Sequence, residues 1–275
     1  MIPILVSAPG RSGTTLMMRL LSQARDVAVA KTPPFEVRLL AYYAYAYRVM
    51  TNAPDIERST HPDRLAGNGL PIGFNPYTAG SFAGAMDPTL LKQYTSGSVP
   101  SILRAAFRDC VRAYYLLIDP NAKFFAEKND SLSECVIAFT ALAFGGIRRI
   151  FMLRDPRDLY CSHRSYFGST PEKAAADVSF AMRKMLQIHE RAERDVLIIR
   201  YEDLVRKAEA TKAALEKFVG IRIGAADDAA GFASHGTSKS REESIGRWQT
   251  DMDADQQARF IPTWQPAMNA YGYTD

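Results

Sequence analysis

The sequence has little cysteine, and its three cysteines match no disulfide or metal-ligand pattern. They are Cys110, Cys135 and Cys161 in a chain of 275 residues. An odd number at this spacing predicts free thiols in a reducing compartment. The pattern gives no reason to expect a metal ion and excludes a small fold that depends on disulfides.

Long apolar runs are also missing. The apolar stretch near the start of the chain is short and has no basic residues before it, unlike a secretory signal peptide. No later window approaches the roughly 18 apolar residues of a membrane-spanning helix. We therefore expect a cytoplasmic protein without a membrane span.

Charge of one sign is only slightly in excess. The net charge is +4, with 47% hydrophobic and 23% charged residues, and this composition is typical of globular proteins. A mild positive excess suits an anionic ligand, but it is too small and too dispersed to indicate a nucleic-acid partner. We expect a single domain over residues 1–275.

Short β-rich runs alternate with longer helical runs along the chain. This alternation predicts parallel strands joined by crossover helices, in a three-layer α/β/α fold with a central, mostly parallel sheet. Ligands then bind at the carboxyl ends of the strands. The expected strands are residues 2–7, 27–30, 123–127, 149–153 and 196–200, and the expected helices are residues 14–24, 132–144 and 202–219.

Two segments interrupt this alternation. Residues 51–100 are rich in Gly, Pro, Asn, Ser and Thr, which predicts an irregular insertion or a lid over an acceptor site. Residues 224–249 are polar and small as far as Gly246. The tyrosine-rich run at 42–47 is typical of a core-facing helical stripe, with an aromatic acceptor pocket as the alternative.

A glycine-rich loop with the sequence Ser-Ala-Pro-Gly-Arg-Ser-Gly-Thr-Thr follows the first expected strand and precedes the first helix. Two glycines permit a tight turn that points backbone N–H groups at an anion, and the helix N-terminus adds partial positive charge. This is a P-loop-like arrangement for binding a nucleotide phosphate. The residues expected to bind are Gly10, Arg11, Ser12, Gly13, Thr14 and Thr15.

The loop is not a Walker A motif, which ends in Gly-Lys-Ser/Thr. Here Thr14 follows Gly13, and the cation lies earlier, at Arg11. A P-loop kinase, which needs that lysine and a carboxylate for Mg²⁺, therefore stands only as the alternative function. A non-catalytic nucleotide-binding scaffold is a third hypothesis.

A second motif of interest covers Arg149–Ser162. Arg154 ends a strand, Asp155 can cap the next helix, and Pro156 suits its first position. Ser162 then projects from the helix nearly two turns later. An arginine at the strand end and a hydroxyl on the helix can meet one phosphate, although a surface ion pair and an ordinary helix serine are the simpler alternatives.

These motifs resemble those of the sulfotransferase superfamily that uses 3′-phosphoadenosine-5′-phosphosulfate. Residues 9–15 are similar to its 5′-phosphosulfate loop, with arginine where many cytosolic relatives carry lysine, and residues 149–162 are similar to its 3′-phosphate segment. The Ser-Ile-Gly-Arg-Trp sequence at 244–248 resembles a segment of bacterial and Golgi-type members. The likeness is therefore closer to the Golgi and tyrosylprotein group than to the cytosolic phenol type.

The resemblance implies a sulfotransferase that moves a sulfuryl group onto a hydroxyl or amine and releases adenosine 3′,5′-bisphosphate. It implies that Arg154 and Ser162 hold the 3′-phosphate, and that Ser244, Arg247 and Trp248 help to bind the nucleotide. The Arg-Tyr-Glu-Asp-Leu sequence at 200–204 is also similar to the family, and we expect its role to be mostly structural. The sequence leaves open whether the acceptor is a small molecule, a glycan or a lipid.

Sulfuryl transfer requires deprotonation of the acceptor and stabilisation of charge on the leaving phosphate, but it requires no metal because the leaving group is already good. We expect Arg11 and the loop amides to stabilise that charge. Glu36 is the expected general base, because family members with a glutamate base carry it at a similar place. The alternatives are a helix first-turn role for Glu36, and His163 or His61 as the base.

Lys128 is the remaining expected catalytic residue. The Phe-Ala-Glu-Lys-Asn sequence at 125–129 resembles a Glu-Lys-Thr-Pro stretch of the family. The resemblance implies that Lys128 touches the bridging or sulfuryl oxygens. The alternative is an ion pair with Glu127 or Asp130.

Overall fold

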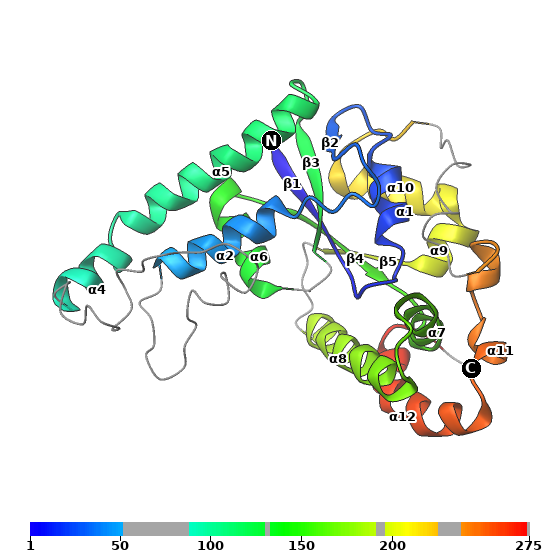
Figure 1. Cartoon of the computed structure of the whole chain (residues 1–275). Coiled ribbons are helices and arrows are strands. Elements are labelled where there is room, and N and C mark those ends of the chain that lie inside the picture. The colour runs from blue at the N-terminus through cyan, green and yellow to red at the C-terminus, as the bar shows by residue number, and fades with distance from the viewer. Residues whose placement is uncertain (52–87, 130–132, 191–195, 225–237, 274–275) are drawn as a thin grey trace.

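A parallel sheet forms the centre of the computed structural model (Figure 1), which describes residues 1–51, 88–129, 133–190, 196–224 and 238–273. Within these residues, five strands pair in parallel in the order β2-β3-β1-β4-β5. The predicted α/β class with a central parallel sheet is confirmed. The strands are β1 (Ile2–Ser7), β2 (Val27–Val29), β3 (Phe124–Asn129), β4 (Arg148–Leu153) and β5 (Val196–Arg200).

The helices follow the predicted alternation, with two differences. The predicted helix 202–219 is two helices, because Lys207 N donates to Asp203 O at 2.8 Å and closes the first of them. The end of the predicted irregular insertion is helical, and residues 52–87 lie outside the described chain. The helices are α1 (Thr14–Leu21), α2 (Leu39–Thr51), α4 (Pro88–Ser96), α5 (Val99–Ile118), α6 (Glu134–Phe144), α7 (Pro156–Phe167), α8 (Pro171–Glu190), α9 (Tyr201–Arg206), α10 (Ala208–Val219), α11 (Trp248–Asp251) and α12 (Ala254–Ala270).

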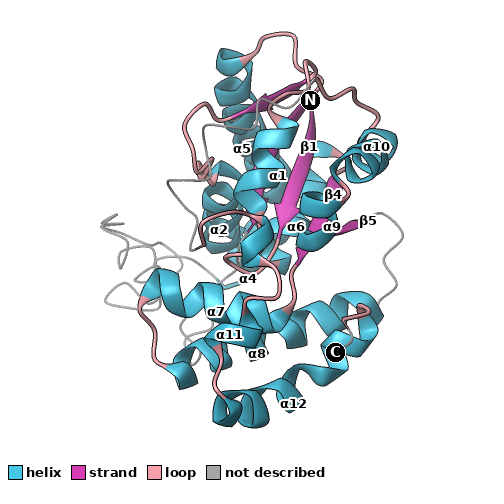
Figure 2. Cartoon of the chain, turned by 90° about the vertical axis from the view of Figure 1, so that its right-hand side faces the viewer, coloured by secondary structure: helices cyan, strands magenta, loops and turns pink. Residues whose placement is uncertain are grey.

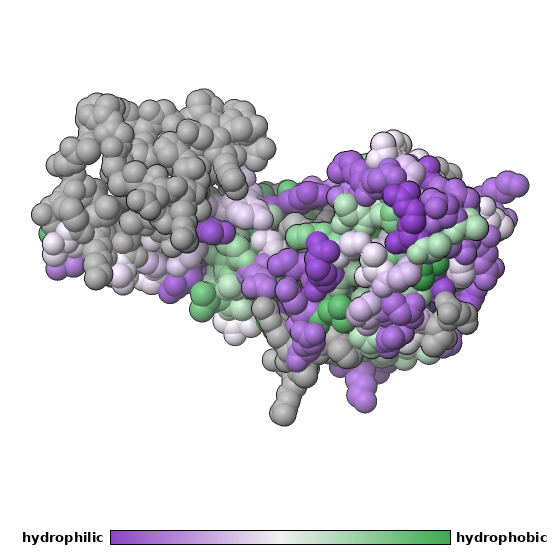
Figure 3. Space-filling model, turned by 90° about the horizontal axis from the view of Figure 1, so that it is seen from below, coloured by the Kyte–Doolittle hydropathy of each residue, from purple (hydrophilic) through white to green (hydrophobic). Residues whose placement is uncertain are grey.

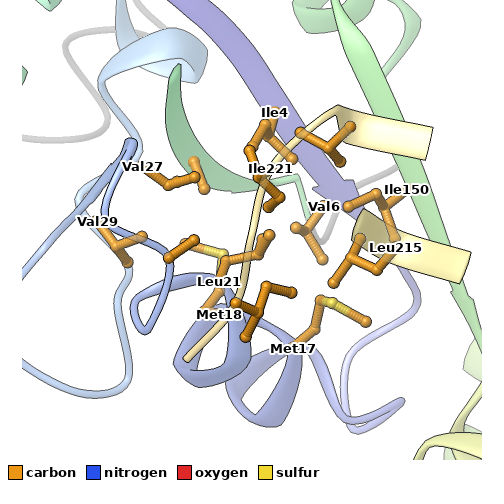
Figure 4. Close-up of a cluster of buried hydrophobic side chains, with 14 of the residues drawn as sticks. Ile4, Val6, Met17, Met18, Leu21, Val27, Val29, Ile150, Leu215 and Ile221 are labelled. Carbon is orange, nitrogen blue, oxygen red and sulfur yellow. The ribbon is translucent and has the colours of Figure 1, made fainter. Parts of the chain in front are cut away.

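Each central strand is buried on both faces, which explains why the strands read as continuous apolar runs. Ile4 and Val6 of β1 point to the face that α1 and α10 cover, where they meet Met17 and Leu215 (Figure 4). Leu5 points to the opposite face, which α2, α5 and α6 cover. Helices on both faces complete the predicted three layers.

The second face contains a buried carboxylate. Glu127 accepts a hydrogen bond from Tyr115 Oη at 2.8 Å and another from Leu40 N at 2.9 Å. Burial raises the pKa of Glu127 to about 7. Because Leu40 lies in the first turn of α2, Glu127 ties the start of that helix to β3.

The tyrosine-rich run lies on α2 and is split between core and surface. The Tyr43 ring packs on Phe107 with centroids 5.0 Å apart, and Tyr47 packs on Phe139 at 5.4 Å. Tyr42 and Tyr45 are exposed. The inward-facing half of the stripe, Tyr43 and Tyr47, is partly buried and packs against the core, as the helical spacing indicates.

A further group of helices lies beyond the carboxyl ends of the strands. In two perpendicular views, α7, α8, α11 and α12 gather below the sheet at the end where β1 points (Figures 1 and 2). Their core contains the fully buried rings of Tyr160 and Trp264. This group places α7 next to the loop that follows β1.

The surface of the described residues is mixed. Seen from below, hydrophilic side chains are interspersed with separate apolar patches (Figure 3). Among the described residues, no helix is both long enough and apolar enough to cross a membrane.

Candidate active site

The loop between β1 and α1 makes a tight turn, in which Ser12 N donates to Pro9 O at 3.3 Å. Arg11 and Gly13 both have left-handed backbones, with φ of 72° and 89°, and Ser12 lies between them. Where left-handed and right-handed backbone conformations alternate, successive N–H groups point toward one place and form an anion-binding nest. The first turn of α1 adds N–H groups that have no partner within the helix.

The two glycines of the loop play different parts. Gly10 does not have a positive φ, and a Cβ there would meet nothing within 4 Å. The turn requires Gly13 instead, where an added Cβ would lie 2.5 Å from Cδ2 of Tyr201. The expectation that both glycines serve the turn is therefore wrong for Gly10, because Arg11 takes the strained conformation in its place.

The replacement Gly13→Ala is expected to distort the loop. A left-handed backbone costs a residue with a side chain about 1–2 kcal/mol, and the Tyr201 ring must also move. Denaturant unfolding should show a loss of at least that size, and nucleotide affinity should fall with it. Gly10→Ala is the matched control, and an equal effect of both replacements would contradict this account of the loop.

Arg11 joins the loop to α7. Its Nε donates to Ser162 Oγ at 3.4 Å, and its guanidinium lies 4.0 Å from the centroid of the Tyr166 ring. Burial lowers the pKa of Arg11 from its ordinary value, but arginine still keeps its charge in proteins. The residues expected to contact opposite ends of one nucleotide thus touch each other.

Arg154 at the end of β4 donates to backbone carbonyls on two sides. Nη1 donates to Arg11 O at 3.0 Å, and Nη2 donates to Ser244 O at 2.7 Å. Its Nε is buried without a hydrogen-bond partner among the described residues. The alternative interpretation, in which Arg154 forms an ion pair at the surface, is therefore wrong. Its two terminal nitrogens instead connect the loop to the Ser244 segment.

Tyr201 connects the same three segments. Its ring lies against Gly13, which precedes α1, and the Arg154 Cζ atom lies 4.7 Å from the ring centroid. Its hydroxyl is 2.9 Å from Ser244 Oγ. The structure thus gives the Arg-Tyr-Glu-Asp-Leu segment the structural role that we expect from the sequence.

Lys128 and Glu36 meet near the start of α1. Lys128 Nζ donates to Thr15 Oγ1 at 2.9 Å and lies 3.3 Å from Glu36 Oε1, and its side chain is 1% exposed. Glu127 is not its partner, because neighbouring strand residues point to opposite faces and Glu127 faces α2 and α5. Asp130, the other alternative partner, lies outside the described residues.

Glu36 precedes α2 rather than occupying its first turn, because the helix begins at Leu39. A helix-dipole role is therefore excluded. Its carboxylate also pairs with Arg38 at 3.0 Å and remains partly exposed. A carboxylate held by a lysine at the edge of the phosphate loop can accept a proton from an incoming group.

The two histidine alternatives are placed differently. The Nε2 atom of His163 lies 3.8 Å from Asp177, and burial lowers the pKa of His163. His61 lies outside the described residues.

The remaining predicted nucleotide residues lie against α7. Arg247 donates from Nη2 to Ser165 Oγ at 3.1 Å and from Nε to Asp251 at 2.6 Å. The Trp248 ring lies under the Arg157 guanidinium, with Cζ 4.1 Å from the centroid. These two residues form the α11 side of the site.

Asp155, the carboxylate that a kinase would need for Mg²⁺, already has hydrogen-bond partners. Asp155 caps α7 through the N–H of Arg157 at 2.9 Å, as the sequence predicts, and also binds the guanidinium of Arg157. In the described residues, no group of three or more His, Cys, Asp or Glu side chains could hold a metal ion.

The sequence reasoning missed two residues on α7, Asp158 and Tyr166. They lie four residues before and four residues after Ser162, so that all three share one face of the helix. Tyr166 packs on Arg11, and Asp158 accepts hydrogen bonds from residues 246 and 248. The i,i+4 spacing from Ser162 was the signal that could have identified them.

The arrangement is suited to a bisphosphorylated ligand. Ser12 is fully buried. Neither Ser12 Oγ nor Arg154 Nε has a hydrogen-bond partner among the described residues. Buried polar groups normally have partners, so both are donors available to an anion. Ser12 lies on the loop, and Arg154 follows the end of β4 and donates to Arg11 O.

Comparison with known proteins agrees with this geometry. The sulfotransferase domain of the olefin synthase from Synechococcus PCC 7002 has a TM-score of 0.59 at 15% identity, covering 99% of this chain and 95% of that one. The sulfotransferase domain from the curacin biosynthetic pathway has a TM-score of 0.57 at 13% identity, covering 100% and 99%. Among curated proteins, no sequence matches significantly. Because the model of the Sulfotransferase family matches residues 3–225, this chain belongs to that family of sulfuryl-transferring enzymes.

Proposed function

We propose that this enzyme transfers a sulfuryl group from 3′-phosphoadenosine-5′-phosphosulfate to a hydroxyl or amine of a small-molecule, glycan or lipid acceptor. The observation that carries the proposal is the contact between the two phosphate-binding motifs. Arg154 Nη1 reaches Arg11 O at 3.0 Å, and Arg11 Nε reaches Ser162 Oγ at 3.4 Å. Motifs this close can bind the two phosphate groups of one nucleotide.

The donor supplies an activated sulfuryl group, so the protein's task is to position it and to stabilise charge on the leaving phosphate. The loop amides, the Ser12 hydroxyl and the Arg11 guanidinium surround the place expected for the 5′-phosphosulfate. Such preorganised donors act strongly where water is excluded. Arg154 and Ser162 would hold the 3′-phosphate through charge-assisted hydrogen bonds.

Glu36 and Lys128 provide the acceptor side of the mechanism. Glu36 would take the proton from the acceptor, and the buried Lys128 ammonium would hold Glu36 and contact the sulfuryl oxygens. The 3.3 Å separation of Glu36 Oε1 and Lys128 Nζ supports this assignment. Thr15 orients Lys128 from the first turn of α1.

Nucleotide binding gives the first test. Adenosine 3′,5′-bisphosphate should raise the melting temperature without Mg²⁺, and ADP with Mg²⁺ should raise it less. Arg154→Ala should weaken binding of the bisphosphate by about 1.5–3 kcal/mol, the range for hydrogen bonds to charged groups. Equal stabilisation by both nucleotides, or an unchanged dissociation constant for Arg154→Ala, would contradict a 3′-phosphate site at Arg154.

Activity gives the second part of this test. The enzyme should be incubated with the sulfuryl donor and a panel of sugars, phenols, amines and lipids, followed by mass spectrometry for the added mass of one SO₃ group. The Glu36→Gln enzyme is the matched blank because it retains the nucleotide site.

A further inference from the structure

The buried aspartate Asp158 on α7 has no role in the chemistry proposed above. Its side chain belongs to the first turn of the helix, and Asp158 is 1% exposed. It nevertheless contacts a segment some 90 residues further along the chain. Burial of a carboxylate costs free energy unless hydrogen bonds compensate for its lost hydration, so its partners matter.

Both carboxylate oxygens of Asp158 accept backbone hydrogen bonds from that segment. Oδ2 accepts from Gly246 N at 2.7 Å, and Oδ1 accepts from Trp248 N at 3.1 Å. Gly246 has a left-handed backbone, with φ of 80°, so the chain turns sharply at this point. The Asp158 carboxylate therefore binds the backbone on both sides of Arg247.

The neighbouring residue on α7, Arg157, also contacts this segment. The Arg157 guanidinium packs on the Trp248 ring and is itself fixed by Asp155. Further along α7, Ser165 accepts a hydrogen bond from Arg247. The helix that carries Ser162 therefore sets the position of residues 246–248.

We propose that Asp158 is the positioning residue for the nucleotide site, because it holds Gly246 and Trp248 so that the 244–248 segment faces the same ligand as Ser162. This inference rests on the proposed function. Asp158 itself does not touch the nucleotide in this account. It acts through the two backbone N–H groups that it fixes.

The protonation state of Asp158 provides a readout of this role. Burial raises the pKa of Asp158 to about 6. Below that pH the carboxyl is neutral and one of its oxygens is a hydroxyl, which is a weaker acceptor than a carboxylate oxygen, so its hydrogen bonds to the two N–H groups weaken. The charged groups that act on Asp158 are Asp155 and Arg154, which follow β4. The Cys161 thiol on α7 interacts with Asp158 and with Arg247 and Asp251 around α11. Arg157 is paired with Asp155.

The first experiment follows the segment without any ligand. The chain has two tryptophans, so fluorotryptophan labelling should give two fluorine NMR resonances, which Trp248→Phe assigns. The Trp248 resonance should shift with a midpoint near pH 6 in the wild type and should not shift in Asp158→Asn. The fully buried Trp264 is the internal reference.

The second experiment measures the dissociation constant of adenosine 3′,5′-bisphosphate by calorimetry against pH. At neutral pH, Asp158→Asn should bind about 10-fold more weakly or worse, the ratio for one hydrogen bond to a charged group. The ligand phosphates also titrate near pH 6, but they do so equally with both proteins. The ratio between wild type and variant should therefore shrink toward one as the pH falls through 6.

Asp203→Asn is the control, because it removes a carboxylate from the first turn of another helix close to the site. Two results would overturn the inference. One is a dissociation constant for Asp158→Asn equal to that of the wild type, and the other is a Trp248 resonance that shifts with pH in Asp158→Asn as it does in the wild type. Absence of bisphosphate binding to the wild type would instead contradict the proposed function, and the fluorine spectra would still decide whether Asp158 positions the 244–248 segment.

Discussion

Replacing Arg11 with alanine is expected to lower kcat about 10²–10³-fold, the range for loss of one preorganised transition-state donor. Arg11 is the cation inside the phosphate loop, and its strained backbone is fixed by contacts to Ser162, Tyr166 and Arg154. Strain of this kind persists where the surrounding structure over-determines it. Steady-state kinetics with the sulfuryl donor gives the measurement.

Two control variants make the result specific. Arg11→Lys keeps the charge but loses the planar contact with Tyr166, and it should retain more activity than the alanine variant. Lys31→Ala removes an exposed cation near β2 and should leave kcat unchanged. An alanine variant at position 11 with wild-type kcat would remove Arg11 from the transition state.

The second large effect is expected for Glu36→Gln, which should lower kcat about 10²–10⁴-fold because an amide cannot take the acceptor's proton. Nucleotide affinity should change little, since Glu36 contacts Lys128 and Arg38 rather than the phosphate loop. Rapid-quench kinetics and calorimetry on the same preparation separate the two quantities.

Glu209→Gln, an exposed carboxylate on α10, is the matched control and should behave as the wild type. Full activity of Glu36→Gln would move the base elsewhere, and His163→Gln would then be the next variant to measure. Weakened nucleotide binding in Glu36→Gln, with unchanged kcat, would show that Glu36 belongs to the donor side.

The strands and the phosphate loop could be predicted because local patterns determine them. Apolar runs such as Val196–Arg200 coincide with the strands to within a few residues, and the cap at Asp155 follows from residue type alone. The partners of Arg154 could not be predicted. They are the carbonyls of residues 11 and 244, which only the tertiary fold brings together.

The sequence did not predict the backbone conformation of single residues, or the face of the sheet to which a side chain points. Composition suggested that Gly10 makes the turn, whereas Arg11 takes the left-handed backbone. Composition also suggested irregular chain up to residue 100, whereas a helix begins at Pro88. The strand expected at residues 123–127 ends before Lys128, whereas β3 runs to Asn129. The alternation of side chains that separates Glu127 from Lys128 was therefore missed.

The account depends on one nucleotide engaging both motifs at once. A crystal structure of the chain with adenosine 3′,5′-bisphosphate tests this most directly. We predict the 5′-phosphate on the backbone amides of residues 10–15 and the 3′-phosphate in contact with Arg154 and Ser162. A bound nucleotide that reaches only one of the two motifs, with its other phosphate in solvent, would contradict the account.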